Sequence, residues 1–196
     1  MVVLAETGAS RHVLTLLSAL LLTAACGDGT YALSTSSWPE PGEVQPLPDL
    51  EGSIVELARR SSRCNQDLLH GLVALVGSHM EFPGETVTKL KSPCAGGHEV
   101  RVDIDLEGRS ILYDFSNVVA AQRFPSADFE GFVVTDMYNS VAAFRGVSID
   151  RTVSTMDVRD EAISVRAHSV SVNLAGVAFD PTSFLKIDLL LENVPE

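Results

Sequence analysis

The chain is poor in aromatic residues, in cysteine and in positive charge. Aromatic side chains make up 6% of its 196 residues, three residues are cysteine, and 26 acidic residues outnumber 14 lysines and arginines, for a net charge of −12. An acidic surface repels the phosphates of nucleic acids and anionic lipid headgroups, so nucleic acid is not an expected partner. The composition also excludes collagen-like and coiled-coil architectures.

Long apolar runs are missing as well. The run near the start of the chain, residues 13–22, contains about ten residues, whereas a helix needs about twenty to span a bilayer. Arg11 precedes this run and small residues follow it, which is typical of a secretory signal peptide. We therefore expect residues 1–25 to be a cleaved signal.

The end of the predicted signal and the residue after it read Leu-Thr-Ala-Ala-Cys, residues 22–26. This motif resembles the lipobox of bacterial lipoproteins, in which signal peptidase II cleaves before a cysteine that already carries a diacylglycerol. The resemblance implies that Cys26 is the first residue of the mature chain and attaches it to a membrane through acyl chains such as palmitate. Gly27 stands where aspartate marks retention in the inner membrane of many proteobacteria, so the resemblance favours the outer membrane of a bacterial envelope. An ordinary signal peptide cut near Ala25 is the alternative.

Two cysteines remain after Cys26, namely Cys64 and Cys94. An even number of cysteines in an exported chain predicts a disulfide, and closing a loop of about 30 residues stabilises a fold by about 3–4 kcal/mol. Two buried free thiols are the alternative. A zinc site is disfavoured, because neither cysteine has a second cysteine at Cys-x-x-Cys spacing.

The lipidated cysteine and the residues after it, 26–52, are predicted to form a disordered, acidic tether. Residues 27–51 contain four prolines, a Ser-Thr run and five acidic residues without a basic one. Such a segment buries too little apolar surface to offset the entropy lost on ordering. Residues 53–196 are predicted to form a single globular domain.

We expect this domain to begin with an amphipathic helix over residues 53–78. Ser53 and Glu56 have the spacing of a capping box, and apolar residues follow at helical spacing. This stripe consists of Ile54, Leu57, Ala58, Cys64, Leu68, Leu72, Leu75 and Val76. Polar residues from Ser61 onward interrupt it, which allows a kink, and Arg59 lies on the opposite, solvated side.

From residue 98 the apolar period changes to two, which predicts half-buried strands. Strands are expected over residues 100–107, 110–117, 128–136, 141–150, 152–159, 162–179 and 184–192, with a bulge or a second strand hidden in the long run. The connections are too short for crossover helices, so the sheet should be antiparallel. The predicted fold class is α+β, with the helix packed on one curved antiparallel sheet of about seven or eight strands.

Three glycines share the setting [Phe/Leu]-x-Gly-[Phe/Val], namely Gly131, Gly146 and Gly176. Glycine weakens a strand unless another group approaches closely, so we expect all three on one face at sites of close approach.

The acidic residues Asp103, Asp105, Glu107 and Asp114 imitate the spacing of a calcium loop. Alternating Ile104 and Leu106 place them in a strand, so we interpret them as the outer face of a hairpin and expect no metal site. The chain contains no nucleophile elbow, phosphate-binding loop or dinucleotide fingerprint, which indicates neither an enzyme nor a cofactor.

Three functions therefore remain open. The first is a non-enzymatic structural or protein-binding domain on the membrane, with envelope proteins as partners. The second is a periplasmic carrier or chaperone of an apolar ligand or lipid, which a lined cavity above about 300 Å³ would favour. The third is a hydrolase whose serine, histidine and aspartate come together only in the fold.

Overall fold

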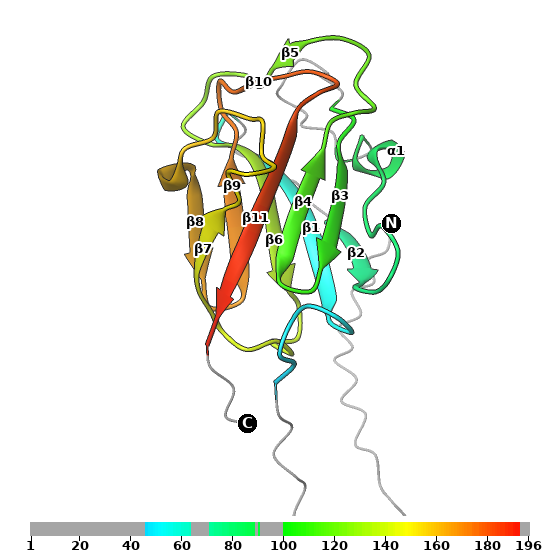
Figure 1. Ribbon diagram of the computed structural model, residues 1–196, viewed down its shortest axis with the longest axis vertical. Coiled ribbons are helices and arrows are strands. Elements are labelled where there is room, and N and C mark those ends of the chain that lie inside the picture. Colours follow the sequence, from blue (N-terminus) through cyan, green and yellow to red (C-terminus); the bar gives the residue numbers. More distant parts are fainter. Residues whose placement is uncertain (1–45, 64–70, 89, 91–99, 193–196) are drawn as a thin grey trace, which may run out of the picture. The chain divides into compact units, whose positions relative to one another are not determined.

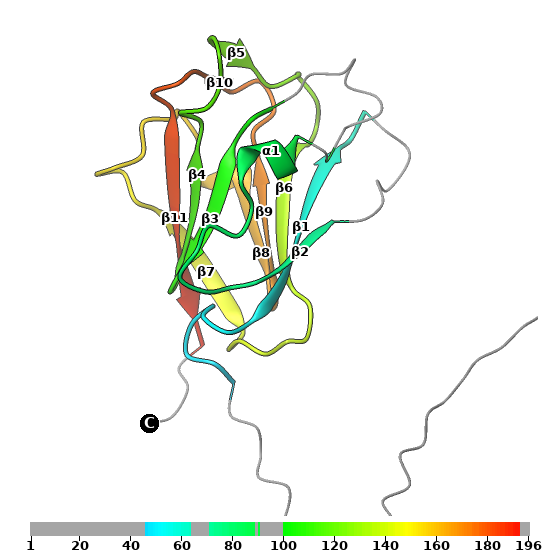
Figure 2. The ribbon, with the colours of Figure 1, turned by 90° about the vertical axis from the view of Figure 1, so that its right-hand side faces the viewer.

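The two-residue alternation expected after residue 98 begins much earlier in the chain, at Ile54. In the computed structural model, which describes residues 46–63, 71–88, 90 and 100–192, strands make up most of the regular structure. They belong to the unit of residues 43–196 and form two sheets packed face to face (Figures 1 and 2). Among these described residues, no helix has the length and hydrophobicity that a membrane crossing requires.

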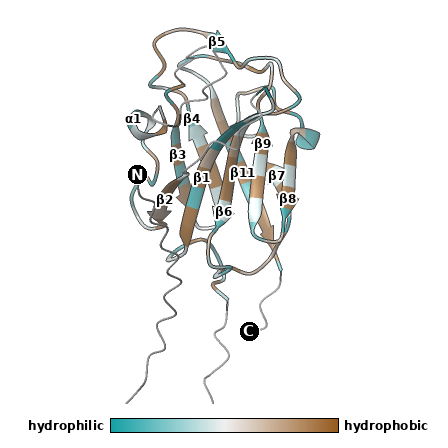
Figure 3. Ribbon diagram, turned by 180° about the vertical axis from the view of Figure 1, so that it is seen from behind, coloured by the Kyte–Doolittle hydropathy of each residue, from teal (hydrophilic) through white to brown (hydrophobic). Residues whose placement is uncertain are grey.

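The first sheet has five antiparallel strands in the order β2-β1-β6-β9-β8. These strands are β1 (Ile54–Ser61), β2 (Leu72–Leu75), β6 (Glu130–Asp136), β8 (Ile163–Arg166) and β9 (Ser169–Asn173). Seen from behind, β1, β6, β8 and β9 carry bands of alternating hydropathy, because successive side chains point to opposite faces (Figure 3).

The second sheet has four antiparallel strands in the order β3-β4-β11-β7. They are β3 (Asp103–Glu107), β4 (Ser110–Asp114), β7 (Phe144–Ile149) and β11 (Phe184–Leu191). A small third sheet pairs β5 (Gln122–Arg123) with β10 (Ala178–Phe179), and two short helices complete the described elements, α1 (Gly84–Val87) and the 3-10 turn Asp160–Ala162. Phe144 N–H donates to the Ala167 carbonyl at 2.8 Å and thereby joins the two large sheets at one edge.

Large apolar side chains fill the space between the two sheets. The fully buried ones include Leu57, Ile104, Leu106, Ile111, Tyr113, Phe115, Phe124, Phe132, Leu174 and Leu185. Phe179 packs on two of these aromatic rings, with ring centroids 4.7 Å from Phe124 and 5.0 Å from Phe115. Aromatic side chains are few in the chain, but several of them are concentrated here.

The predicted helix over residues 53–78 is wrong. Its described residues form β1 and β2, in which Val55 and Leu57 point into the core. Ser53 does not cap a helix, because its hydroxyl donates to the Leu50 carbonyl at 2.6 Å. Glu56 accepts the N–H of Gly71 instead of closing a capping box. Over short stretches the apolar positions fit the period of a helix as well as that of a strand. Tertiary contacts decide which of the two forms.

The predicted single curved sheet is also wrong, although most of its strands are confirmed. The structure has two sheets facing each other, and β3, β4, β6, β7 and β11 lie within the predicted strand ranges. The expected break in the long run is confirmed, because residues 162–179 contain β8, β9 and β10. The strand expected over residues 152–159 is absent from this described stretch, since Asp150 accepts both the N–H and the hydroxyl of Thr152 and turns the chain.

The described chain enters the sandwich at one end, which we call the tether-proximal end, and β5 and β10 lie at the other, which we call the distal end (Figure 1). At the tether-proximal end, residues 46–53 enter beside the loop that follows β6, and Leu47 forms a parallel bridge with Val141. Leu50 is only 1% exposed, so residues assigned to the tether contribute to the core. The distal end carries β5, β10 and the loops over residues 116–121 and 151–159.

Candidate functional site

At the tether-proximal end, one buried carboxylate organises the tight turn after β6. The Asp136 side chain is completely buried. Its Oδ1 accepts the Ser140 hydroxyl at 3.0 Å and the Tyr138 N–H at 3.4 Å, and its Oδ2 accepts the Val141 N–H at 2.9 Å. Asn139 has a φ of 53°, in the left-handed region that asparagine tolerates. The turn is therefore held in one conformation.

Two large side chains of this turn, Met137 and Tyr138, reach solvent beside the exposed Asn139. Met137 is 43% exposed and Tyr138 is 69% exposed. The incoming chain is bonded to the same turn, because Leu47 N–H donates to the Ser140 carbonyl at 2.7 Å. We call residues 137–140 the Asp136 loop. The sequence identified only a turn here, although an aspartate two residues before a loop N–H is the signature of an Asx turn.

Asp136 also brings together a serine and a histidine, the residue types of a hydrolase triad. His168 Nδ1 lies 3.8 Å from Asp136 Oδ2, and Ser140 donates to the same carboxylate. The carboxylate thus lies between the other two groups. A triad requires the imidazole in the middle, where it accepts the hydroxyl of the serine and is oriented by the carboxylate. This cluster shapes the loop and lends no support to a hydrolase.

A second buried polar group lies on the inner face of the first sheet. Arg59 Nη2 and Glu130 Oε1 are 3.0 Å apart, and their side chains are only 3% and 0% exposed. The antiparallel register of β1 and β6 sets Ser61 opposite Glu130. The Ser61 hydroxyl and Glu130 Oε2 form no hydrogen bond within the described part of the chain. The sequence placed Arg59 on a solvated helix face, and nothing local reveals a partner 71 residues away.

The second sheet also carries a buried hydroxyl. Tyr113 in β4 packs on Phe132 with ring centroids 6.0 Å apart, and its hydroxyl is buried without a hydrogen bond among the described residues. Burial raises the pKa of the Tyr113 phenol, so the group stays protonated and neutral.

Two open depressions are lined by residues of the distal end. One of about 300 Å³ is lined by Ala121, Gln122, Thr155, Met156, Asp157, Ala178, Phe179, Asp180, Thr182 and Ser183. The pKa of Asp180 is lowered because the hydroxyl and N–H of Thr182 donate to its carboxylate. A second depression of about 220 Å³ is lined by Arg101, Val118, Val119 and Gln122. Both mix polar and apolar groups, which suits a small polar molecule better than an acyl chain.

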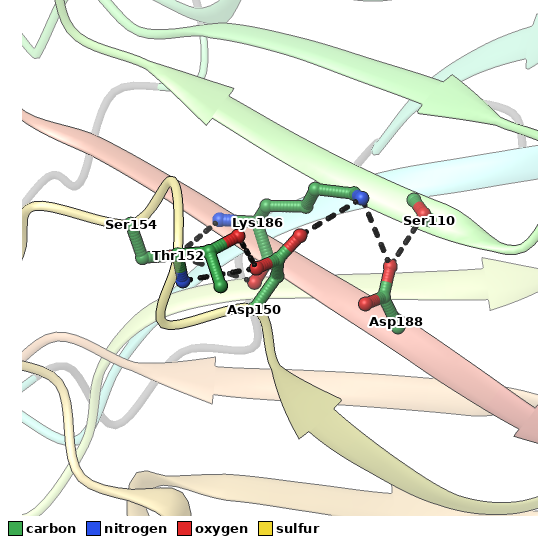
Figure 4. A network of polar contacts seen from close by, with 6 residues as sticks. All are labelled: Ser110, Asp150, Thr152, Ser154, Lys186 and Asp188. Carbon is green, nitrogen blue, oxygen red and sulfur yellow. Dashed lines mark hydrogen bonds and ion pairs between the residues drawn. The ribbon is translucent and has the colours of Figure 1, made fainter.

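The outer face of the second sheet carries a network of charges (Figure 4). Lys186 Nζ lies 3.2 Å from Asp150 Oδ2 and 3.5 Å from Asp188 Oδ1, and Ser110 donates to Asp188 at 2.7 Å. Hydrogen bonds from Thr152, followed by the one from Lys186, lower the pKa of Asp150. The carboxylates of Asp150 and Asp188 raise the pKa of Lys186. The network ties β4 and β11 to the turn after β7.

Asp150→Asn is expected to destabilise the protein at neutral pH but not in acid. A carboxyl whose pKa is lowered by folding stabilises the fold above its unfolded pKa, and this contribution disappears as the pH falls through the folded value. The difference in melting temperature between wild type and Asp150→Asn should therefore shrink below about pH 3.9. Thermal melts from pH 2 to 8 measure it, with the exposed Asp128→Asn as the matched control. A difference that stays constant across this range would contradict the prediction.

The calcium-like residues belong to the β3–β4 hairpin as expected, but Asp103 is only 9% exposed and does not lie on a solvated outer face. The Asp103 carboxylate accepts the Gly84 N–H and the Asn117 amide, both at 2.5 Å, and Asp114 accepts the Ser116 N–H at 2.8 Å. Asp105 and Glu107 lie along β3 with Asp103. Within residues 46–63, 71–88, 90 and 100–192, no three His, Cys, Asp or Glu side chains are grouped to hold a metal ion.

Near this hairpin, Glu81 receives two backbone donors, Gly77 N–H and Leu106 N–H, each at 2.9 Å. Burial raises the pKa of Glu81, and the neighbouring Asp105 raises it further, while the two N–H groups oppose the shift. Glu81 thus fixes the segment before α1 against the edge of β3.

Cys26, Cys64 and Cys94 all lie outside the described residues, so the lipid attachment and the disulfide remain predictions. The comparisons with known proteins add no relative. No protein family matches the chain, and neither a curated protein sequence nor a solved structure is significantly similar to it.

Proposed function

We propose that the chain is an exported lipoprotein of the bacterial cell envelope, held on the outer membrane by lipid on Cys26. Its β-sandwich is a non-enzymatic domain that binds another envelope protein. The observation that carries the proposal is the Leu-Thr-Ala-Ala-Cys motif at residues 22–26, directly after an apolar run of signal-peptide length. A disulfide between Cys64 and Cys94 is part of the proposal, since it suits an oxidising compartment.

The arrangement of the two ends supports a binding role. The chain enters at the tether-proximal end, whereas the distal end carries several loops and two depressions. Loops at one end of a rigid sandwich commonly carry binding residues. Val119 is 92% exposed and Val153 is 45% exposed at this end, and exposed apolar side chains suit a protein partner. The distal loops are the surface we assign to the partner.

The carrier of an apolar ligand is the second candidate, and the described depressions do not favour it. A carrier needs a lined apolar cavity, but the depression of about 300 Å³ is open and includes Asp157 and Asp180. The space between the two sheets is occupied by side chains such as Phe132 and Tyr113, both at 0% exposure.

Cys26→Ser tests the proposal directly. Without the thiol no diacylglycerol can be attached, so the variant should be an uncleaved precursor or a soluble protein, while wild type sediments with membranes. The acidic tether adds no electrostatic attraction, so the lipid supplies nearly all the affinity, about 0.8 kcal/mol per buried CH₂. Cell fractionation and the mass of the mature amino terminus measure the outcome.

Two further variants sharpen this experiment. Cys64→Ser/Cys94→Ser removes two thiols outside the motif and should remain on the membrane, which controls for loss of thiols in general. Gly27→Asp should move the protein toward the inner membrane in a proteobacterial host. A wild-type amino terminus that is unmodified, starts at a residue other than Cys26 and belongs to a soluble protein would overturn the proposal.

A further inference from the structure

We infer that the Asp136 loop lies against the lipid bilayer and inserts Met137 and Tyr138 at the boundary between headgroups and acyl chains. This inference rests on the proposed lipid anchor at Cys26. It assigns a membrane contact to the folded domain itself, in addition to the lipid.

The described chain begins beside this loop. Leu47 N–H donates to the Ser140 carbonyl at 2.7 Å, and the Leu47 carbonyl accepts the Ala142 N–H at 3.2 Å. Residues 27–45 separate Cys26 from the described chain, and a stretch of this length reaches at most about 70 Å. On a chain anchored at Cys26, the loop therefore has a high effective concentration at the membrane surface, so that even a weak contact with lipid is populated.

The loop presents its apolar side chains in a fixed arrangement. Asp136 is completely buried and accepts hydrogen bonds from Tyr138, Ser140 and Val141, so the turn loses little freedom on binding. Tyr138 is 69% exposed and Met137 is 43% exposed at the tip. A tyrosine suits the membrane interface, because its ring is apolar and its hydroxyl remains hydrated.

The charges around the loop indicate which lipid it meets. Residues 137–140 contain neither lysine nor arginine, and in the incoming chain Asp49 and Glu51 outnumber the one cation bonded to it, Arg109, whose Nε donates to the Pro48 carbonyl at 3.0 Å. Acidic residues are repelled by anionic headgroups and tolerate zwitterionic ones. The loop therefore fits a surface of zwitterionic phospholipid.

Tryptophan fluorescence tests this contact in the full chain purified from membranes. Trp38 is the single tryptophan, so Trp38→Phe gives a background without tryptophan. In that background, Tyr138→Trp places a loop probe in the Asp136 loop and Val119→Trp places a distal probe at the other end, where Val119 is 92% exposed. Both proteins are reconstituted into vesicles of phosphatidylcholine with brominated acyl chains, which quench tryptophan at contact. Equal melting temperatures confirm that both variants are folded.

Brominated lipid should quench the emission of the loop probe roughly twofold and leave the emission of the distal probe nearly unchanged, since an interfacial side chain reaches the acyl boundary. If the protein floats with the vesicles but the two probes are quenched equally little, the inference is wrong and the lipid anchor stands. A loop probe that is shielded from aqueous iodide without lipid quenching would overturn it in favour of a protein contact. A protein that does not float and has an unmodified amino terminus overturns both proposals.

Discussion

Glu130→Leu is expected to lower the free energy of unfolding by about 3–5 kcal/mol, because it leaves the buried guanidinium of Arg59 without this carboxylate. The two side chains are 3% and 0% exposed, so water cannot replace the lost carboxylate without opening the sandwich. For a domain of this size the melting temperature should fall by roughly 10–15 °C. Urea unfolding and calorimetry measure both quantities.

The double substitution Arg59→Met/Glu130→Leu should recover at least about 2 kcal/mol of the loss, since a packed apolar pair carries no desolvation penalty. Asp160→Asn is the matched control, because Arg151 and Asp160 form a pair whose side chains are 51% and 77% exposed. Breaking an exposed pair changes stability by less than about 1 kcal/mol. If Glu130→Leu cost no more than this control, the buried pair would not stabilise the sandwich.

Gly131→Ala is expected to destabilise the protein by about 3 kcal/mol, because overpacking forces the backbone to move. A Cβ at Gly131 would lie 1.9 Å from the carbonyl oxygen of Val172. That oxygen belongs to β9, the neighbour of β6 in the middle of the first sheet, so the two strands must separate. Chemical denaturation of the purified variant measures the loss.

The other two glycines of the shared pattern are the controls, because the expectation that all three lie on one face at sites of close approach is wrong. Gly146 lies in the other large sheet, where a Cβ would be 3.4 Å from Leu190 Cδ1, so Gly146→Ala should change stability by less than about 0.5 kcal/mol. Gly176 lies in a turn with a φ of 73°, and Gly176→Ala should cost about 1 kcal/mol of backbone strain. Equal effects at the three positions would contradict this assignment.

Several strands after residue 102 were predictable because one face is buried and the other is more exposed, although β6 is buried on both faces. In β3, Ile104 and Leu106 are buried while Glu107 is exposed, and this alternation is a local property that the sequence carries. The break between β8 and β9 was also readable, since the buried positions change parity on either side of Ala167. The pairing of these strands into two separate sheets could not be predicted, because it depends on long-range contacts.

The start of the domain was not predictable in the same way. Over the segment of β1, apolar residues at Ile54, Leu57 and Ala58 fit a helix, while Val55 and Leu57 fit a strand. The decisive residue is Arg59, which a local argument assigns to solvent. It points inward because Glu130, far along the chain, supplies a buried carboxylate. Because a charged residue occupies an inward position, the apolar residues of β1 do not alternate with the two-residue period of a strand.

The sequence by itself determined what depends on a few adjacent residues. The Leu-Thr-Ala-Ala-Cys motif predicts the anchor, because signal processing acts on a short, extended segment rather than on a fold, and the alternation of β3 and β4 predicts a hairpin. The tertiary structure alone decided which distant groups meet. Asp136 gains its neighbour His168 only when β6 lies beside β9, and Leu47 reaches the Asp136 loop only when the sandwich has formed. Such contacts arise from chain closure over tens of residues, and their free energies are absent from any local pattern.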